Sequence, residues 1–355
     1  MLPFAVIAVL GPGIGLVSGE LLPVKVVAWL QTRGTPFVFL PKFSDHSYRF
    51  KLDAVLRQRP DAIAFGSSRA NQWRSAMFRP TSFYNAANAI FVMRDLHRML
   101  EEFGDSAPRV IIFSMDYFTF VPAFERVYRH QSREDVGSWG SPEQIRITQK
   151  VLGELMRDPK AFWSAPRDGV WALGISAIKT GVGFRLDGSY YYGGLDPVRG
   201  QDTVAAIAAG TQWPVPPASR LEESSMLDFE RFTDLARQKG VVLVGVTMPF
   251  VPEVRAAMQQ SPLYQAWRQF ESDETKDWIR KQGVIYFDFS ELESFGGRPD
   301  EFADPFHPSE PAYIRMLISM LGNDRFRALF PDIDIGGLQE RLKNATRLDA
   351  YGNEF

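Results

Sequence analysis

The sequence contains no cysteine, only four histidines, and almost no excess of charge of either sign. Without cysteine, disulfides, thiolate metal sites and a cysteine nucleophile are excluded, although the compartment is left open. Lysine and arginine number 40 against 42 aspartates and glutamates, so the chain lacks the basic balance typical of nucleic-acid binding. The histidines are widely spread, which argues against a zinc site. We therefore expect no metal, no organic cofactor and no nucleic-acid partner.

Charge is also missing from the start of the chain. Leu2 to Val17 carries no charged side chain, and the first acidic residue is Glu20. This run is shorter than the roughly 20 residues of a spanning helix, and the basic flank of a secretory signal is absent. Three interpretations stay open: an uncleaved membrane anchor, a cleaved signal, or a buried N-terminal segment. The anchor is favoured, so residues 1–20 predict an exported, extracytoplasmic protein anchored to the inner membrane.

Short apolar runs alternate with segments of helical spacing in the rest of the chain. The runs predict strands at 61–65, 83–84, 109–115, 241–246 and 284–287, and the spacing predicts helices at 71–78, 90–103, 142–156, 227–239 and 264–280. Strands that alternate with helices indicate an α/β fold, a three-layer sandwich in which helices cover both faces of a parallel sheet of about five strands.

The expected domain organisation has four parts. Residues 1–20 form the anchor or signal, 21–60 a lead-in, 61–330 the α/β domain, and 331–355 a polar, peripheral C-terminal tail. A long insertion at about 120–220 separates the third and fourth strands, and intervals of such length are typical of functional elaborations. It contains Tyr190, Tyr191 and Tyr192, which indicate either a β-hairpin packed on the core or a surface on which a sugar stacks.

Two distant motifs supply the side chains of a nucleophilic hydrolase or acyltransferase. Ser68 ends a Gly-Ser-Ser segment directly after the first strand, where outward-pointing N–H groups and the helix dipole favour an oxyanion. Asp304 precedes His307 by three residues, so the carboxylate can hold the imidazole that takes the serine proton. Each motif also has a purely structural interpretation, Ser68 as a helix cap and the Asp/His pair as a surface turn.

These residues, with Asn85-Ala86-Ala87-Asn88 and Met115-Asp116 between them, resemble the four sequence blocks of the SGNH (GDSL-type) hydrolase superfamily. The resemblance covers roughly residues 58–120 and 240–322. It implies an SGNH/flavodoxin-like sheet, with Ser68 as nucleophile, His307 as base and Asp304 as the acid of the triad.

The chain departs from the superfamily pattern on the oxyanion side. The glycine of the second block falls at Ile90, or near Ala87 in a shifted register, and the asparagine of the third block aligns with Met115, which cannot donate a hydrogen bond. Asn85 and Asn88 are the candidate replacements.

Other polar residues near the motifs have two interpretations each. Arg69 either holds an anionic group of the substrate or pairs with a carboxylate such as Asp116, which in turn fixes the strand-end loop. Trp73 and Arg74, one helical turn beyond the serine, are candidates to line the cleft.

Within the superfamily, the chain is similar to membrane-tethered branches, namely the D-alanyl transfer proteins and the alginate-type O-acetyltransferases. This resemblance implies serine-dependent acyl transfer onto a cell-envelope or exported polysaccharide, with an acyl donor, a carbohydrate substrate and a membrane-bound O-acyltransferase as partner. Three alternatives stay open: a carbohydrate esterase of the same mechanism, a catalytically silent subunit that binds glycan or a membrane partner, and an unrelated α/β protein with chance motifs.

Overall fold

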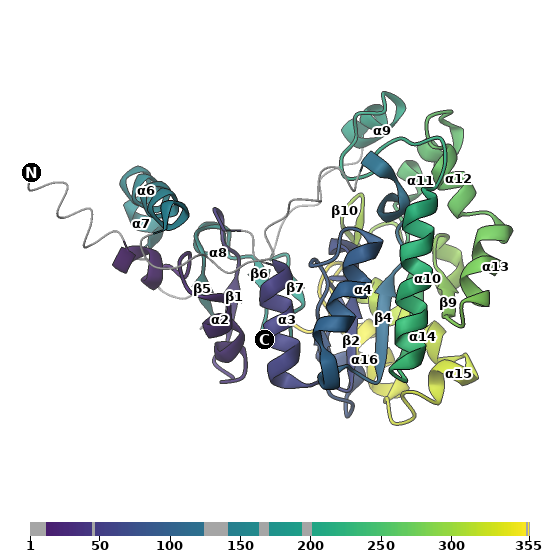
Figure 1. The fold of residues 1–355 in the computed structure, drawn as a ribbon, viewed down its shortest axis with the longest axis horizontal. Coiled ribbons are helices and arrows are strands. Elements are labelled where there is room, and N and C mark those ends of the chain that lie inside the picture. The colour runs from purple at the N-terminus through teal and green to yellow at the C-terminus, as the bar shows by residue number, and fades with distance from the viewer. Residues whose placement is uncertain are drawn as a thin grey trace, which may run out of the picture. The chain divides into compact units, whose positions relative to one another are not determined.

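The computed structural model of the chain describes residues 12–44, 47–123, 141–162, 170–193, 201–352 and 354. The protein is mixed α/β, and its residues divide into two compact units (Figure 1). The smaller unit falls within Met1–Gln58 and Gln131–Gly194, and the larger within Arg59–His130 and Leu195–Glu354. The predicted serine motif and the Asp/His motif both belong to the larger unit.

The larger unit is built on a five-stranded sheet in which all pairs are parallel, as the alternation of strands and helices predicts. In sheet order the strands are β3 (Phe83–Asn85), β2 (Ala62–Phe65), β4 (Val110–Ser114), β8 (Val242–Thr247) and β9 (Ile285–Asp288). Counted along the chain, this is the doubly wound order 2-1-3-4-5, whose topological switch point lies between β2 and β4. Ligands of such sheets bind beside the carboxyl ends of the strands at that point.

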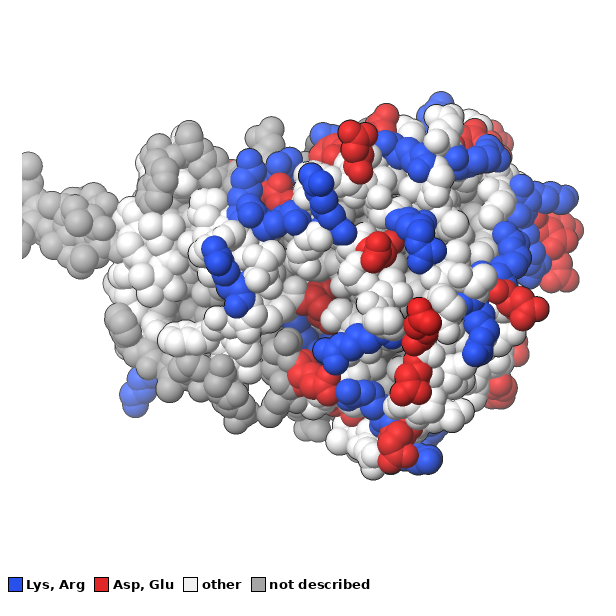
Figure 2. Space-filling model, turned by 90° about the horizontal axis from the view of Figure 1, so that it is seen from below, with Lys and Arg blue, Asp and Glu red and all other residues white. Residues whose placement is uncertain are grey.

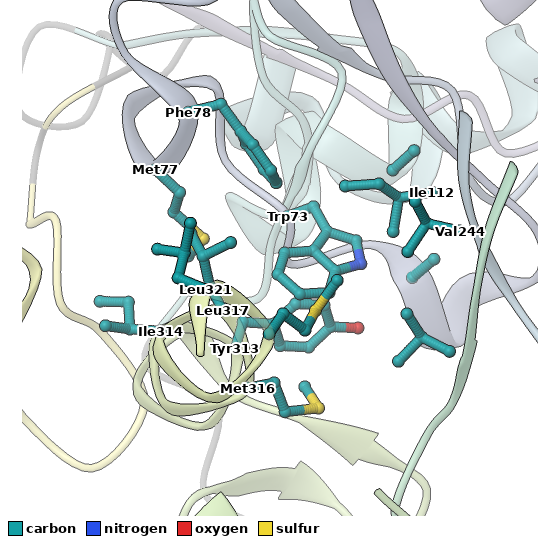
Figure 3. Packing of buried hydrophobic residues seen from close by; sticks show 14 of the residues in the cluster. Trp73, Met77, Phe78, Ile112, Val244, Tyr313, Ile314, Met316, Leu317 and Leu321 are labelled. Carbon is teal, nitrogen blue, oxygen red and sulfur yellow. The ribbon is translucent and has the colours of Figure 1, made fainter. Parts of the chain in front are cut away.

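Helices pack against the two faces of this sheet through alternate side chains of its strands. On one face, α14 (Glu310–Leu321) joins the strands in the main hydrophobic cluster, where Ile112 and Val244 lie beside Trp73 and Tyr313 (Figure 3). On the other face, Phe113 contacts aromatic rings of α10 (Glu223–Gln238), which runs beside α4 (Met93–Glu102).

The remaining elements of the larger unit lie between these strands in the chain or follow the last of them. They are η1 (Ser68–Ala70), η2 (Ser75–Phe78), η3 (Gly104–Ser106), η4 (Tyr117–Phe120), α9 (Gln201–Ala208), α11 (Pro252–Gln260), α12 (Gln265–Phe270), α13 (Asp273–Lys281), η5 (Leu292–Phe295), β10 (Phe302–Asp304), β11 (His307–Pro308), α15 (Asp324–Arg327) and α16 (Ile335–Asn344), where η denotes a 3-10 helix.

Two predicted helices are wrong in form. Of the helix expected at 71–78 only η2 is present, because Arg74 directly before it is extended and sends its guanidinium to Glu310, 2.6 Å away. The helix expected at 264–280 is two helices, α12 and α13. The first ends at Phe270 with Glu271 as its C-cap, and Ser272 caps the second, since its hydroxyl accepts a hydrogen bond from the Thr275 N–H.

The smaller unit combines segments that the sequence analysis assigned to the lead-in and to the insertion. Its four-stranded sheet runs in the order β5 (Trp171–Leu173), β1 (Phe37–Phe39), β6 (Gly183–Phe184) and β7 (Tyr190–Tyr191). The pair β1–β5 is parallel and the other pairs are antiparallel. The helices are α2 (Val24–Gln31), α3 (Ser47–Gln58), α6 (Pro142–Arg157), α7 (Pro159–Phe162) and α8 (Ile175–Thr180). The tyrosine run thus forms the expected hairpin, and the helix predicted at 142–156 is confirmed.

The predicted anchor is only partly described, since residues 1–11 lie outside the described ranges and residues 12–17 are helical. In the part of the chain that the structure describes, no helix is both long enough and apolar enough to cross a bilayer. On the face shown in Figure 2, basic and acidic side chains are interspersed over the larger unit.

Candidate active site

Ser68, His307 and Asp304 form one hydrogen-bonded chain at the carboxyl end of the sheet. His307 Nε2 lies 2.8 Å from Ser68 Oγ, and His307 Nδ1 lies 2.7 Å from Asp304 Oδ2. The structure therefore brings the two motifs together across 239 positions of sequence. A hydroxyl, an imidazole and a carboxylate thus stand within the hydrogen-bond reach that a serine triad requires.

The Asp/His pair is held by a short antiparallel hairpin of β10 and β11. Asp304 Oδ1 accepts the N–H groups of Phe306 at 2.8 Å and of His307 at 3.0 Å, which leaves Oδ2 for the imidazole. Burial raises the pKa of Asp304, but the hydrogen bond and charge of His307 together with the two N–H groups outweigh it, so the pKa lies below its ordinary value. Asp304 therefore stays ionised and fixes the tautomer of His307.

The turn that presents Ser68 depends on a close approach between β2 and β4. Gly66 has φ of +118°, and a Cβ atom there would lie 2.1 Å from the Ser114 hydroxyl, so only glycine fits. That hydroxyl accepts the Ser67 N–H at 3.2 Å. Sequence reasoning missed Ser114, although its position at the end of the strand paired with β2 could have indicated it.

Arg69 joins the nucleophile turn to the other loops of the site. Its guanidinium pairs with Asp116 Oδ1 at 2.8 Å and donates to the carbonyls of Met248 and Pro249, both at 2.6 Å, and of Phe306 at 3.2 Å. Burial lowers the pKa of Arg69, and the charge of Asp116 offsets part of this effect. Arg69 is thus the partner of Asp116, not a group exposed to substrate.

Asp116 also supports the serine turn directly. Its Oδ2 accepts the Ser67 hydroxyl at 2.6 Å, and that hydroxyl in turn accepts the Arg69 N–H at 3.1 Å. Ser67 and Asp116 are only 3% and 1% exposed, so this network lies in the interior next to Ser68. Its role is to fix the turn.

The two asparagines expected to replace the oxyanion donors differ in their contacts. The Asn85 amide is buried and donates to the carbonyls of Ala70 and Trp73, each at 2.9 Å, so it holds the turn together. Asn88 is half-buried in a left-handed conformation (φ +63°), and its N–H donates to the Gly66 carbonyl at 2.9 Å. Within the described ranges, the Asn88 side chain and the Ser68 N–H have no hydrogen-bond partner, which leaves both available to an oxyanion.

The resemblance places a side-chain oxyanion donor at position 115 and a backbone donor at position 90. Met115 and Ile90 are both buried, and the Met115 thioether cannot donate a hydrogen bond. The Met115 N–H is already bonded to the Val246 carbonyl at 2.8 Å.

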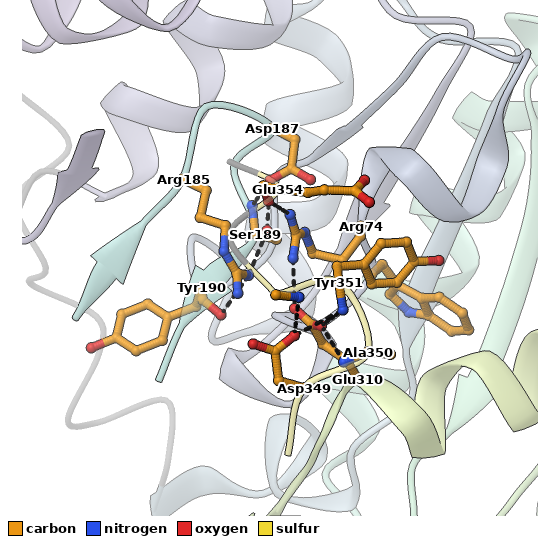
Figure 4. A network of polar contacts seen from close by, with 12 residues as sticks. Arg74, Arg185, Asp187, Ser189, Tyr190, Glu310, Asp349, Ala350, Tyr351 and Glu354 are labelled. Atoms are coloured by element: carbon orange, nitrogen blue, oxygen red, sulfur yellow. Dashed lines mark hydrogen bonds and ion pairs between the residues drawn. The ribbon is translucent and has the colours of Figure 1, made fainter. Parts of the chain in front are cut away.

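Trp73 and Arg74 were candidates to line the cleft, but both are buried in structural contacts. The Trp73 ring meets Tyr313 edge-on at 4.7 Å. Arg74 pairs with Glu310, whose second oxygen accepts the N–H groups of Ala350 at 3.1 Å and Tyr351 at 3.2 Å (Figure 4). Tyr351 belongs to the main hydrophobic cluster. This part of the C-terminal tail was expected to be peripheral, and that expectation is wrong.

Tyr191 belongs to the smaller unit, whereas Ser68, Asp304 and His307 belong to the larger one. Tyr191 lies on β7, and the Arg185 guanidinium stands 4.9 Å from the centre of its ring. Of the remaining histidines, His97 lies beside Glu101 on α4, while His46 and His130 fall outside the described residues.

No protein-family model, no curated protein and no solved structure matches this chain. Among the residues that the structure describes, no group of three or more His, Asp and Glu could hold a metal ion. The chemistry of the site therefore has to be inferred from its own geometry.

Proposed function

We propose that the chain is an SGNH-type, serine-dependent acyltransferase that acylates a cell-envelope or exported polysaccharide. The observation that carries the proposal is the chain from Asp304 through His307 to Ser68, with contacts of 2.7 and 2.8 Å. Its position after β2, at the switch point of a doubly wound sheet, supports it. In this proposal the larger unit is a three-layer sandwich of the SGNH type, and residues 120–220 are an insertion into it.

The reaction follows from the order of the three side chains. Ser68 Oγ attacks the carbonyl carbon of the acyl donor while His307 Nε2 takes the hydroxyl proton. Collapse of the tetrahedral intermediate breaks the bond to the leaving group, which receives that proton from His307 and leaves an ester on Ser68. A sugar hydroxyl then attacks the ester carbonyl while His307 Nε2 takes its proton. The bond between the acyl carbon and Ser68 Oγ breaks, His307 returns the proton to Ser68 Oγ, and the acylated sugar leaves. Asp304 holds the imidazole and stabilises the imidazolium throughout.

The negative oxygen of each intermediate needs donors beside Ser68. The free Ser68 N–H supplies one, and the side-chain amide of Asn88 supplies the second in place of the missing asparagine at position 115. Two donors of this kind are the usual complement of an oxyanion hole, so a Met at 115 does not abolish the chemistry.

The location and partner in this proposal come from the resemblance to envelope acyltransferases. We infer export, an inner-membrane anchor at residues 1–20, and a membrane-bound O-acyltransferase that delivers the acyl group. Carbohydrate, not water, is then the physiological acceptor.

The test compares the wild type with Ser68→Ala in two assays, labelling by a fluorophosphonate and turnover of an activated acetyl ester. We expect labelling and turnover in the wild type and neither in the variant. Ser106→Ala, which changes the last residue of η3, is the matched control and should behave as the wild type. Equal labelling of wild type and Ser68→Ala would refute the catalytic role.

Acceptor sugars added to the ester assay separate transfer from hydrolysis. Acetylated sugar at the expense of free acetate is the expected product. Acetate alone, unaffected by any sugar, would make the protein an esterase of the same mechanism.

A further inference from the structure

A concave site lies in the larger unit, and Ser68, Asp304 and His307 do not line it. It is a cavity of about 560 Å³, within the size range of sites that bind small molecules. Its lining is dominated by charged side chains from α11, α12, α13, β9 and the segment that follows β9: Arg255, Arg268, Glu271, Lys276, Asp288 and Glu291. None of these side chains takes part in the serine chemistry described above.

The cavity opens at the same edge of the sheet as Ser68. Asp288 is the last residue of β9, as Ser68 follows the last residues of β2, and all five strands are parallel. Three strand intervals separate β2 from β9, a distance of roughly 14 Å across the sheet. Val251, directly before α11, also donates its N–H to the Pro305 carbonyl at 3.3 Å, which joins one wall of the cavity to the loop of the triad.

Donors and acceptors are balanced within the cavity. Lys276 Nζ lies 2.7 Å from Asp288 Oδ2 and 4.0 Å from Glu271 Oε2. Nearer the solvent, Arg255 pairs with Glu291 at 2.8 Å, and Arg268 donates to the Ser261 carbonyl at 2.7 Å. Three cationic groups therefore face three carboxylates. A small ion of either sign meets as much repulsion as attraction there.

A neutral ligand with neighbouring hydroxyl groups suits this lining better than an ion. Carboxylates only accept hydrogen bonds and guanidinium or ammonium groups only donate them, whereas a hydroxyl does both. The Arg255 guanidinium is paired at one terminal nitrogen, with Glu291, and a guanidinium carries five N–H donors, so others remain for a ligand oxygen. A pyranose ring presents such oxygens on adjacent carbons.

We propose that this cavity binds a neutral sugar unit of the polysaccharide, with ring hydroxyls between the carboxylates of Glu271 and Asp288 and the guanidinium of Arg255. A sugar held here leaves a neighbouring unit of the same chain free to reach Ser68 along the sheet edge. The role as the acceptor site rests on the proposed function, but sugar binding itself does not require the serine.

The test is calorimetric titration of the full chain with a panel of neutral gluco-, manno- and galacto-oligosaccharides, and with inorganic phosphate as the anionic probe. We expect at least one oligosaccharide to bind with a Kd below about 10 mM and phosphate to bind more weakly. Ser68→Ala should bind the same sugar with unchanged affinity. Glu271→Gln and Arg255→Gln should each weaken it about tenfold or more, because each removes a hydrogen bond to a charged group.

Arg231→Gln, which removes a comparable exposed pair with Asp228 on α10, is the matched control and should leave affinity unchanged. The proposal is overturned if no member of the panel binds, if phosphate binds more tightly than every sugar, or if both cavity variants bind normally. Because Arg255 lies in an exposed pair, its variant remains informative even if Glu271→Gln fails to fold. Sugar binding without Ser68-dependent turnover would support the cavity as a sugar site and refute the acyltransferase proposal. Ser68-dependent turnover without sugar binding would support the proposed enzyme and refute the sugar site.

Discussion

The guanidinium of Arg69 lies 2.8 Å from the carboxylate of Asp116, and both side chains are almost wholly buried, 4% and 0% exposed. Asp116 follows β4 and Arg69 follows β2, so the pair spans the switch point of the sheet directly beneath Ser68. A buried ion pair adds little stability over apolar residues of similar size, yet it is costly to break on one side. Its clearest contribution is to hold the serine turn and the Asp/His loop in one arrangement.

Arg69→Met should therefore destabilise the protein by about 3–5 kcal/mol, because Asp116 is left buried without its partner. Residual folded variant should show a lower kcat with little change in KM, since the substrate does not contact Arg69. Urea unfolding and steady-state kinetics with the acetyl ester measure the two effects. Arg98→Met, which removes an exposed pair with Glu102, is the control and should cost no more than about 1 kcal/mol. Similar losses for the two variants would contradict the assigned role of Arg69.

Asp304→Asn should lower kcat by a factor of about 10⁴, the loss that the same change produces in serine proteases, because the amide favours the wrong tautomer of His307. Labelling by a fluorophosphonate should slow in parallel. Asp300→Asn, which alters an exposed aspartate paired with Arg298, is the matched control and should leave turnover unchanged. A loss of less than tenfold would show that another group orients the imidazole.

The pKa of Asp304 also predicts how stability depends on pH. Because its pKa in the folded protein lies below the ordinary value of about 3.9, the ionised group stabilises the fold fully above that pH. The contribution is lost as the pH falls through the folded pKa. The free energy of unfolding of the wild type should therefore exceed that of Asp304→Asn at pH 6, and the difference should shrink below about pH 4. A difference that grows in acid would reverse the sign and contradict this pKa.

Asn88 and Asn85 should respond differently to substitution. Asn88→Gly keeps the left-handed backbone conformation but removes the amide, so kcat should fall by about 10²–10³ with stability nearly unchanged. Asn85→Ala removes three buried hydrogen bonds, to Ala70, Trp73 and Ala87, and should mainly destabilise the protein. Thermal unfolding and ester turnover of both variants distinguish the roles. Full activity in Asn88→Gly would assign the second oxyanion donor elsewhere.

The parallel sheet and the three residues Ser68, Asp304 and His307 could be predicted from sequence because each follows from a local pattern. Continuous apolar runs mark strands with both faces covered, and the carboxyl ends of such strands meet at one edge, so Ser68 could be expected there. Asp304 and His307 could be paired with it because they stand three residues apart. The supporting groups could not be predicted in the same way. From the sequence, the charge of Arg69 could bind either the substrate or a carboxylate such as Asp116. Only the structure shows that the two side chains are buried and paired with each other.

Long-range packing also explains the errors in the remaining elements. The spacing at 71–78 is typical of a helix, but Arg74 adopts an extended conformation in which its guanidinium pairs with the buried carboxylate of Glu310. From the sequence, the lead-in and the insertion are predicted as separate segments. They share one sheet because β1 pairs with β5 and β6, and no local sequence pattern predicts that pairing. The C-terminal tail is polar along most of its length, so no periodic apolar pattern there predicts that Tyr351 is buried.

Removal of residues 349–355 should destabilise the larger unit. It deletes the buried Tyr351 ring and also the N–H groups of Ala350 and Tyr351 that donate to the Glu310 carboxylate. Loss of a buried aromatic side chain costs about 3–5 kcal/mol, and Arg74 additionally loses the carbonyl of Glu354. Since Glu310 stands three residues after His307, the shortened protein should also turn over the ester more slowly. Tyr351→Phe is the matched control: its hydroxyl has no partner among the described residues, so it should unfold at the same temperature as the wild type or slightly higher. A truncated protein with wild-type stability would mean that the tail does not pack as described.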